Sequence, residues 1–227
     1  MSSSDDDGPD SEAANDFLSV SEELEGFLML YRFGLEEMMT KVNILKQELT
    51  HTASYDCPIE HVTFRLKRTT ALAEKARRLG CTSLEDVREL VSDIAGIRVV
   101  CSFVSDAYTV LEMLQRQPDV RVVQIKDYIA DPKPSGYKSL HLIVEIPVFL
   151  SDRTERVRVE IQIRTVAMDF WASLEHKIHY KYQRAVPERL RDELAGVAAA
   201  TDRLDQQMEQ LHRDSRGTRE SRDPATR

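Results

Sequence analysis

The ten residues from Arg156 to Thr165 alternate between apolar and polar side chains. The apolar members are Val157, Val159, Ile161 and Ile163, and the polar members are Arg156, Arg158, Glu160, Gln162 and Arg164. This period of two predicts a β-strand with one face on a core and one polar face. A solvated outer face is the ordinary explanation of the polar side. A carboxylate flanked by guanidinium groups also suits a metal-bound phosphate, which is the second interpretation.

The 227-residue chain has a formal net charge of −8, which argues against a general binder of nucleic acid or of an anionic membrane. The charge is unevenly distributed, because residues 1–16 carry six acidic side chains and no basic one. The segment from Arg65 to Arg78 instead holds six basic residues and one acidic residue, Glu74. A concentrated basic segment in an acidic protein favours a small polyanion as its ligand, with a solvated helix face as the alternative.

The three cysteines, Cys57, Cys81 and Cys101, lack metal-binding spacing, so we expect free thiols. No apolar run approaches the roughly 18 residues of a membrane-spanning helix. The acidic N-terminus also lacks the basic start of a signal peptide. These observations predict a cytoplasmic protein with no membrane contact.

The remaining pattern predicts an α+β fold, in which a small mixed β-sheet is flanked by helices. We expect helices over 21–50, 58–79, from 83, over 105–115, 166–182 and 187–212, and strands over 94–103, 120–128, 139–148 and 156–164. Residues 1–16 are expected to be a disordered acidic tail and residues 213–227 a polar tail, with one domain over 17–212. The apolar stripe of the first helix is expected to pack on the core, and a subunit interface is the alternative.

Two of these strands carry further candidates. Asp93 precedes the strand that contains Arg98, which places a carboxylate and a guanidinium group near one strand entry. In the strand over 139–148, His141 and Glu145 alternate with apolar residues. If this strand pairs with 156–164, both can share a face with Glu160. A purely structural histidine and a turn-forming aspartate are the ordinary alternatives.

A loop and a basic segment complete the candidates. Tyr137 and Lys138 follow the loop over 131–136, where an aromatic ring could stack on a nucleobase or simply cover the sheet edge. Lys75 and Arg78 are expected on one face of the helix over 58–79, three residues apart. These residues favour a nucleotide or another phosphorylated ligand.

Six runs of sequence, at 57–67, 74–78, 93–99, 127–141, 159–165 and 168–177, resemble those of the RelA/SpoT-type alarmone synthetases in the same order. They are most similar to the stand-alone small synthetases, and the resemblance covers residues 21–212. It implies a nucleotidyltransferase-like synthetase domain that transfers the β,γ-pyrophosphate of ATP to the 3′-hydroxyl of GTP or GDP. Such phosphoryl-type transfer depends chiefly on positioning and on neutralisation of charge.

The same resemblance assigns roles to individual residues. Asp93 and Glu160 match carboxylates that coordinate Mg²⁺, and Glu160 is also the candidate to activate the 3′-hydroxyl. The implied ATP contacts are Arg65, Lys67, Lys75, Arg78 and Arg98, and the implied GTP contacts are Tyr137, Lys133, Lys138, His141, Asp169, Gln162 and Arg164. Tyr137 matches a tyrosine that stacks on guanine. Asp169 could read the guanine base or be a helix N-terminal carboxylate favoured by the helix dipole.

The family's small members form homotetramers through their terminal helices, so a homo-oligomer is expected here. The sequence has no His-Asp dipeptide, which the hydrolase domain of the longer members carries, so synthesis without hydrolysis is expected. The alternative function is a non-catalytic nucleotide- or RNA-binding module. The presence of both Asp93 and Glu160 argues against it, because a binding module needs neither carboxylate.

Overall fold

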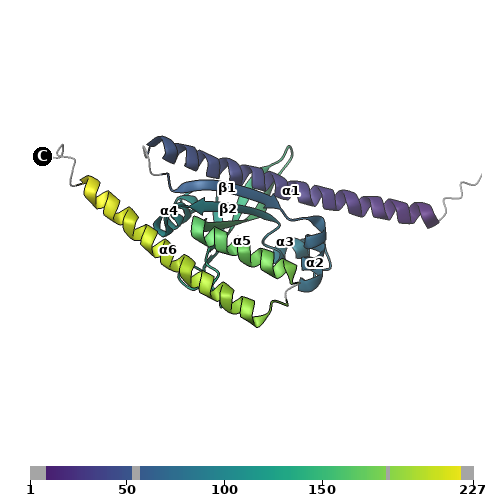
Figure 1. The fold of residues 1–227 in the computed structure, drawn as a ribbon. Helices are drawn as coiled ribbons and strands as arrows, with labels where there is room; N and C mark the ends of the chain where they lie inside the picture. Colours follow the sequence, from purple (N-terminus) through teal and green to yellow (C-terminus); the bar gives the residue numbers. More distant parts are fainter. Residues whose placement is uncertain (1–8, 53–56, 183–184, 221–227) are drawn as a thin grey trace, which may run out of the picture.

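A computed structural model describes residues 9–52, 57–182 and 185–220 (Figure 1). Five strands form one mixed sheet in the order β1-β2-β5-β4-β3. They are β1 (Ile59–Leu66), β2 (Ala95–Cys101), β3 (Arg121–Asp127), β4 (Leu140–Phe149) and β5 (Thr154–Thr165). The central strand β5 runs parallel to β2 and antiparallel to β4, while the two outer pairs are antiparallel. The prediction of an α+β fold with a mixed sheet is therefore confirmed.

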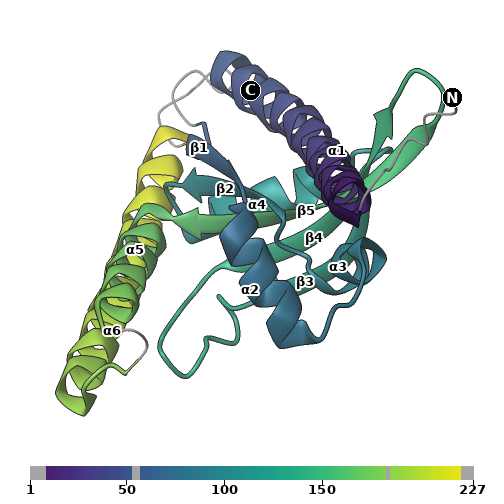
Figure 2. The same cartoon turned by 90° about the vertical axis from the view of Figure 1, so that its right-hand side faces the viewer.

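Six helices surround this sheet within the described ranges. They are α1 (Pro9–Thr52), α2 (Thr69–Leu79), α3 (Leu84–Leu90), α4 (Val104–Gln115), α5 (Val166–Lys181) and α6 (Glu188–Glu220). Helices α1 and α4 pack on one face of the sheet. On the other face, α2 lies in front of the strands, and α5 and α6 run side by side at one edge (Figure 2). The second face is therefore only partly covered.

The alternation of apolar and polar residues along the strands determines which face of the sheet packs against the core. The four apolar residues of β5 are at most 4% exposed, and they pack against α1 and α4. On α1, a Cβ atom at Gly34 would lie 2.7 Å from a methyl group of Val157, so glycine is what lets this helix approach β5 so closely. Phe27, Tyr31 and Met38 of the α1 stripe are also buried, which confirms that the stripe packs on the core.

The single helix expected over 58–79 is wrong. Residues 59–66 form the edge strand β1, antiparallel to β2, and the helix α2 begins only at Thr69. Pro58 stands directly before an edge strand, where proline is tolerated, and does not open a helix. Pairing with β2 and the β-branched and aromatic residues Val62, Thr63 and Phe64 favour the extended conformation.

Both ends of the domain are more helical than the sequence pattern predicts. Residues 9–16 belong to α1, so the expected disordered tail is wrong for them, and residues 1–8 lie outside the described residues. Pro9 at the first helical position and Asp10 in the first turn both favour a helix start there. Helix α6 likewise continues through residues 213–220, which were expected to form a polar tail.

Local signals in the sequence place the other boundaries well. Gly80 ends α2 with a left-handed φ of 75°, and its amide and that of Cys81 reach back to the last helical carbonyls. Ser83 and Asp86 form the expected capping box at the start of α3. Throughout the part of the chain that the structure describes, no helix is long and apolar enough to cross a membrane.

Candidate active site

The polar side chains of β5 lie on the sheet face that α1 and α4 leave uncovered. Two rows of paired residues cross this face. One row is Arg65, Gly96 and Glu160, and the other is Thr63, Arg98, Gln162 and His141. The predicted sharing of one face by His141 and Glu160 is therefore confirmed. Glu145 lies farther along the strand and pairs with Arg158, so its role there is structural.

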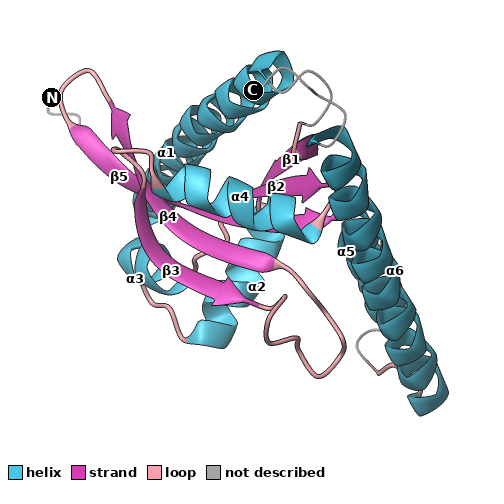
Figure 3. Cartoon of the chain, turned by 90° about the vertical axis from the view of Figure 1, so that its left-hand side faces the viewer, coloured by secondary structure: helices cyan, strands magenta, loops and turns pink. Residues whose placement is uncertain are grey.

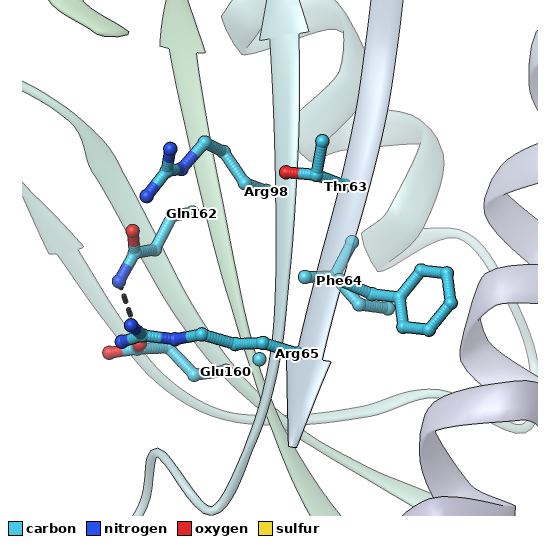
Figure 4. A pocket seen from close by; sticks show the side chains of 8 residues that line it. Thr63, Phe64, Arg65, Arg98, Glu160 and Gln162 are labelled. Carbon is cyan, nitrogen blue, oxygen red and sulfur yellow. Dashed lines mark hydrogen bonds between the residues drawn. The ribbon is translucent and has the colours of Figure 1, made fainter. Parts of the chain in front are cut away.

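Two adjoining cavities open on this face. In the smaller, of about 210 Å³, Arg65, Arg98, Glu160 and Gln162 converge (Figure 4). The larger, of about 480 Å³, extends from Arg98 and Gln162 to Tyr137 and the side of α5. Both cavities are lined by Arg65, Arg98 and Gln162, so two ligands bound there would lie next to each other. This is the arrangement that a transfer between two substrates needs.

Asp93 is held by two lysines at the entry to β2. Its two carboxylate oxygens accept hydrogen bonds from Lys67 and Lys75, each at 2.6 Å. Burial raises the pKa of Asp93, but the hydrogen bonds and charges of the two lysines outweigh burial and hold the pKa below its ordinary value. The carboxylate is therefore ionised at neutral pH. Arg65 and Lys67, expected on the same helix as Lys75, instead come from β1 and from the link that follows it.

Glu160 is the second carboxylate of the face, and its side chain is 13% exposed. One oxygen lies 3.5 Å from Nδ1 of His141, and the other accepts from Nε2 of Gln162 at 2.7 Å. Burial raises the pKa of Glu160, yet these partners lower it below its ordinary value. The charge of Asp93 also acts on Glu160 and raises this pKa, so the two carboxylates are close enough to feel each other.

The donor set can be compared with the needs of Mg²⁺. This ion is usually bound through one or two carboxylates together with substrate phosphates, with water completing the shell. Asp93 and Glu160 are ionised oxygen donors close enough to interact electrostatically, which fits that pattern. Among the described residues there is no group of three or more histidine, cysteine or acidic side chains that could hold a metal without a substrate.

Asp169, in the first turn of α5, pairs with arginines from two strands. Its Oδ1 accepts from Arg164 at 3.0 Å and lies 3.2 Å from Nη1 of Arg98. The side chain that caps α5 is that of Thr165, which accepts from the amide of Met168. Asp169 therefore does more than face the helix dipole, because its carboxylate fixes two of the guanidinium groups that line the larger cavity.

Tyr137 is buried, with 8% of its surface exposed. Its ring packs with Trp171 and Ala172, and Nζ of Lys133 lies 4.7 Å from the ring centroid. The structure thus shows the packing role that was the alternative to base stacking. A base could stack on this ring where Lys133 now lies over it, since the ring also lines the larger cavity.

The loop between β3 and β4 is attached to α6. A Cβ atom on Gly136, whose φ is 85°, would lie 2.5 Å from Cβ of Ala198, so this position suits glycine alone. Lys138 forms an ion pair with Asp202 of α6 and therefore does not point freely into the cavities. Figure 3 shows this loop reaching towards α5 and α6. Of the predicted ATP contacts, Arg78 is exposed on α2.

Sequence reasoning missed the part of the larger cavity that comes from α5. Ser173, His176 and Lys177 line it, although none of them was singled out. They follow Asp169 at four, seven and eight residues, which is the helical spacing that places side chains on one side. A helical reading of the run from Met168 to Lys177 could have found them.

Most of the chain is similar to known proteins of one family. Residues 64–185 match the family model described as a region found in RelA / SpoT proteins. GTP pyrophosphokinase YwaC of Bacillus subtilis is 46% identical over 195 residues, which cover 86% of this chain and 92% of that protein. GTP pyrophosphokinase YjbM of the same organism is 41% identical, over 82% of this chain and 87% of the relative.

Solved structures give the same result. Small alarmone synthetase 1 of B. subtilis bound to its product pppGpp superposes with a TM-score of 0.79 at 40% identity, covering 85% of this chain and 98% of that one. The same synthetase bound to AMPCPP gives a TM-score of 0.74 at 37% identity, covering 86% and 99%. Both similarities extend over nearly the whole of the solved chains.

Proposed function

This chain belongs to the small alarmone synthetases of the RelA/SpoT family, and we propose that it is a GTP pyrophosphokinase. It transfers the β,γ-pyrophosphate of ATP to the 3′-hydroxyl of GTP or GDP and releases AMP. The product is the hyperphosphorylated guanosine alarmone (p)ppGpp. We also propose a cytoplasmic location, since both substrates are cytoplasmic nucleotides and the described cysteines are free thiols.

The observation that carries this proposal is the balance of charges on the open face of the sheet. Two interacting carboxylates, Asp93 and Glu160, lie beside a larger set of basic side chains. The basic side chains that line the two cavities are Arg65, Arg98, Arg164 and Lys177. Lys67 and Lys75 bind Asp93, and Lys133 lies over the ring of Tyr137. An excess of cations suits two polyphosphate substrates, and a pair of carboxylates suits the metal ion that accompanies them.

In the proposed mechanism, Glu160 accepts the proton of the acceptor's 3′-hydroxyl as this oxygen attacks the β-phosphorus of ATP. Its lowered pKa keeps it ionised, and it lines the smaller cavity beside Gln162, the residue that also lines the larger one. Arg65, Arg98 and Lys75 bind the ATP phosphates and stabilise charge that develops on the transferred group. The carboxylate of Asp93 orients Lys67 and Lys75.

We propose Mg²⁺ as the cofactor, held by Asp93 and Glu160 together with the substrate phosphates. When bound, Mg²⁺ neutralises phosphate charge and polarises the transferred group. The acceptor occupies the larger cavity, with its base at the ring of Tyr137 and its phosphates near Lys133 and Lys138. Gln162 and Arg164 line the same space.

The test is to incubate the protein with ATP, GTP and Mg²⁺ and to resolve the nucleotides by anion-exchange chromatography. AMP and pppGpp should form in equal amounts. 3′-Deoxy-GTP, which lacks the attacking hydroxyl, should give no guanosine product and serves as the matched control. Binding of both nucleotides without any turnover would instead support a non-catalytic binding module.

We further propose a homotetramer assembled through the terminal helices. An apolar groove of about 770 Å³ lies between α5 and α6, and Val166, Phe170, Leu204 and Met208 on its lining are 41–65% exposed. Such a surface is typical of a subunit interface. Met208→Glu should shift the mass measured by light scattering towards smaller species, whereas Gln207→Glu, which adds the same charge at an exposed site on α6, should not.

A further inference from the structure

Five side chains on the open face form a closed ring of polar contacts. Nη2 of Arg164 donates to Oη of Tyr137 at 2.6 Å and to Oε1 of Gln162 at 2.8 Å. Oη of Tyr137 lies 2.6 Å from Nε2 of His141, and Nδ1 of His141 lies 3.5 Å from Oε1 of Glu160. Nε2 of Gln162 donates to Oε2 of Glu160 at 2.7 Å and closes the ring. Two branches of the ring therefore connect Arg164 with Glu160. One passes through Tyr137 and His141 to Oε1, and the other passes through Gln162 to Oε2.

The direction of the two hydrogen bonds made by Arg164 follows from the chemistry of arginine. A guanidinium group has donors only, so both Oη of Tyr137 and Oε1 of Gln162 must accept from Arg164. Since Oε1 is the acceptor of Gln162, its amide nitrogen must be the group that faces Glu160. In the other branch, the tyrosine oxygen already accepts, so its own proton is free to point at Nε2 of His141.

The tautomer of His141 depends on the direction of its contact with Tyr137. If Nε2 accepts a proton from the tyrosine hydroxyl, the ring proton of a neutral imidazole is on Nδ1. Nδ1 is the nitrogen that faces Glu160. Burial raises the pKa of Tyr137, so the hydroxyl keeps the proton that this arrangement needs. In this arrangement Gln162 donates to Oε2 of Glu160, and the proton on Nδ1 of His141 points at Oε1, which lies 3.5 Å away.

We propose that His141 and Gln162 are positioning residues that fix the rotation of the Glu160 carboxylate, and that Arg164 sets the direction of both through Tyr137 and the glutamine amide. This proposal rests on the proposed role of Glu160 as the group that accepts the 3′-hydroxyl proton. The terminal torsion of a glutamate is broad and only loosely fixed by its own geometry. A donor on each oxygen removes that freedom and leaves the remaining lone pairs for the substrate.

The proposal gives Tyr137 two separable functions. The face of its ring is the surface on which a guanine could stack, while its hydroxyl belongs to the ring of hydrogen bonds. It also differs from the role implied for His141 by family resemblance, which is a contact with the acceptor's phosphates. A phosphate contact predicts an effect on the binding of GTP, whereas a positioning role predicts an effect on turnover.

The first experiment observes the tautomer directly, in the full-length protein without nucleotide. ¹⁵N-labelled histidine and long-range ¹H–¹⁵N NMR spectra distinguish the two neutral tautomers and the charged form, and loss of the signal in His141→Asn assigns it among the six histidines. Wild-type His141 should carry its proton on Nδ1. In Tyr137→Phe this preference should be lost. Tyr128→Phe is the matched control. Tyr128 also packs edge-on against the imidazole of His141, but its hydroxyl is not one of the groups that form the ring of polar contacts.

A wild-type His141 protonated on Nε2, or on both nitrogens, would overturn the proposal. This readout does not depend on turnover. A protein that makes no alarmone but shows the Nδ1-protonated tautomer would therefore refute the proposed function and leave the hydrogen-bond ring intact.

The second experiment separates kcat from KM. Tyr137→Phe should lower kcat by roughly threefold to tenfold, the effect of one network hydrogen bond, and change the KM for GTP by less than about twofold. His141→Asn, whose amide can donate from the place of Nδ1, should retain more kcat than His141→Gln, whose amide reaches the place of Nε2. If both histidine variants raise the KM for GTP equally and keep the wild-type kcat, the phosphate-contact role is correct and the positioning role is wrong.

Discussion

Asp169→Ala tests how the two arginines of the larger cavity are held. The carboxylate, which is 18% exposed, accepts from Arg164, which is 6% exposed, and pairs with Arg98, which is 36% exposed. Breaking a fully buried ion pair by removing one partner costs about 3–5 kcal/mol. Partial exposure of Asp169 and Arg98 reduces this penalty, so we expect a loss of about 2–3 kcal/mol in the free energy of unfolding. For a chain of this size that corresponds to a fall in Tm of roughly 4–12 °C.

The same variant separates stability from base recognition. If Asp169 also accepts from the guanine base, its loss leaves two base donors unpaired and costs about 1–3 kcal/mol in kcat/KM for GTP. ITP lacks the 2-amino group, so it should lose less than GTP. The measurements are urea unfolding and the ratio of kcat/KM for GTP and ITP. Asp169→Asn is the control, because its amide oxygen can still accept from Arg164.

Two results would refute this reasoning. A variant with the wild-type Tm would show that the pairs with Arg98 and Arg164 contribute nothing to folding. A lowered Tm with an unchanged ratio of kcat/KM for GTP and ITP would support the stabilising role of the ion pairs. It would also show that Asp169 does not recognise the guanine base.

Three further predictions concern charge. Glu160→Gln keeps the shape of the side chain and should lower kcat by about 10²-fold or more with the fold intact; near-wild-type turnover would place the catalytic carboxylate elsewhere. Lys75→Ala should weaken ATP binding measured by calorimetry, and more so at low salt, whereas Arg77→Ala, an equal charge change on the exposed side of α2, should not. Burial raises the pKa of Asp205 to about 6 from 3.8. The folded state then binds the proton more tightly than the unfolded state, so the free energy of unfolding should fall by on the order of 2–3 kcal/mol as pH rises from about 4 to 7. Asp205→Asn should remove this fall in urea unfolding series, and an unchanged pH profile would contradict it.

Elements with a clear local signal could be predicted from sequence. The alternation of β5, the glycine after α2 and the capping box of α3 each depend on a few neighbouring residues, and each is found in the structure. The strand β1 could not be predicted in this way. Its residues are compatible with a helix after Pro58, and pairing with β2 decides between the two conformations.

The candidate site shows the same division. A period of two along β4 and β5 is enough to place His141 and Glu160 on one face once the strands pair. The partners of Asp93 could not be predicted, because Lys67 and Lys75 reach it from the β1–α2 link and from α2. The ion pair between Lys138 and Asp202 joins residues 64 positions apart, and no local pattern predicts such a contact.

The alternation of β5 has a consequence for how mutations in this chain would be tolerated. In a deep mutational scan scored separately for protein abundance and for catalytic output, positions 157, 159, 161 and 163 should lose abundance, because their side chains are at most 4% exposed. Positions 160 and 162 should lose output first and abundance little. Substitutions that alter the packing of β5 and substitutions that alter its chemistry therefore fall on alternate residues of the same strand. Positions 158 and 164 should lose both, since Arg158 binds the last carbonyls of α3 and Arg164 is buried.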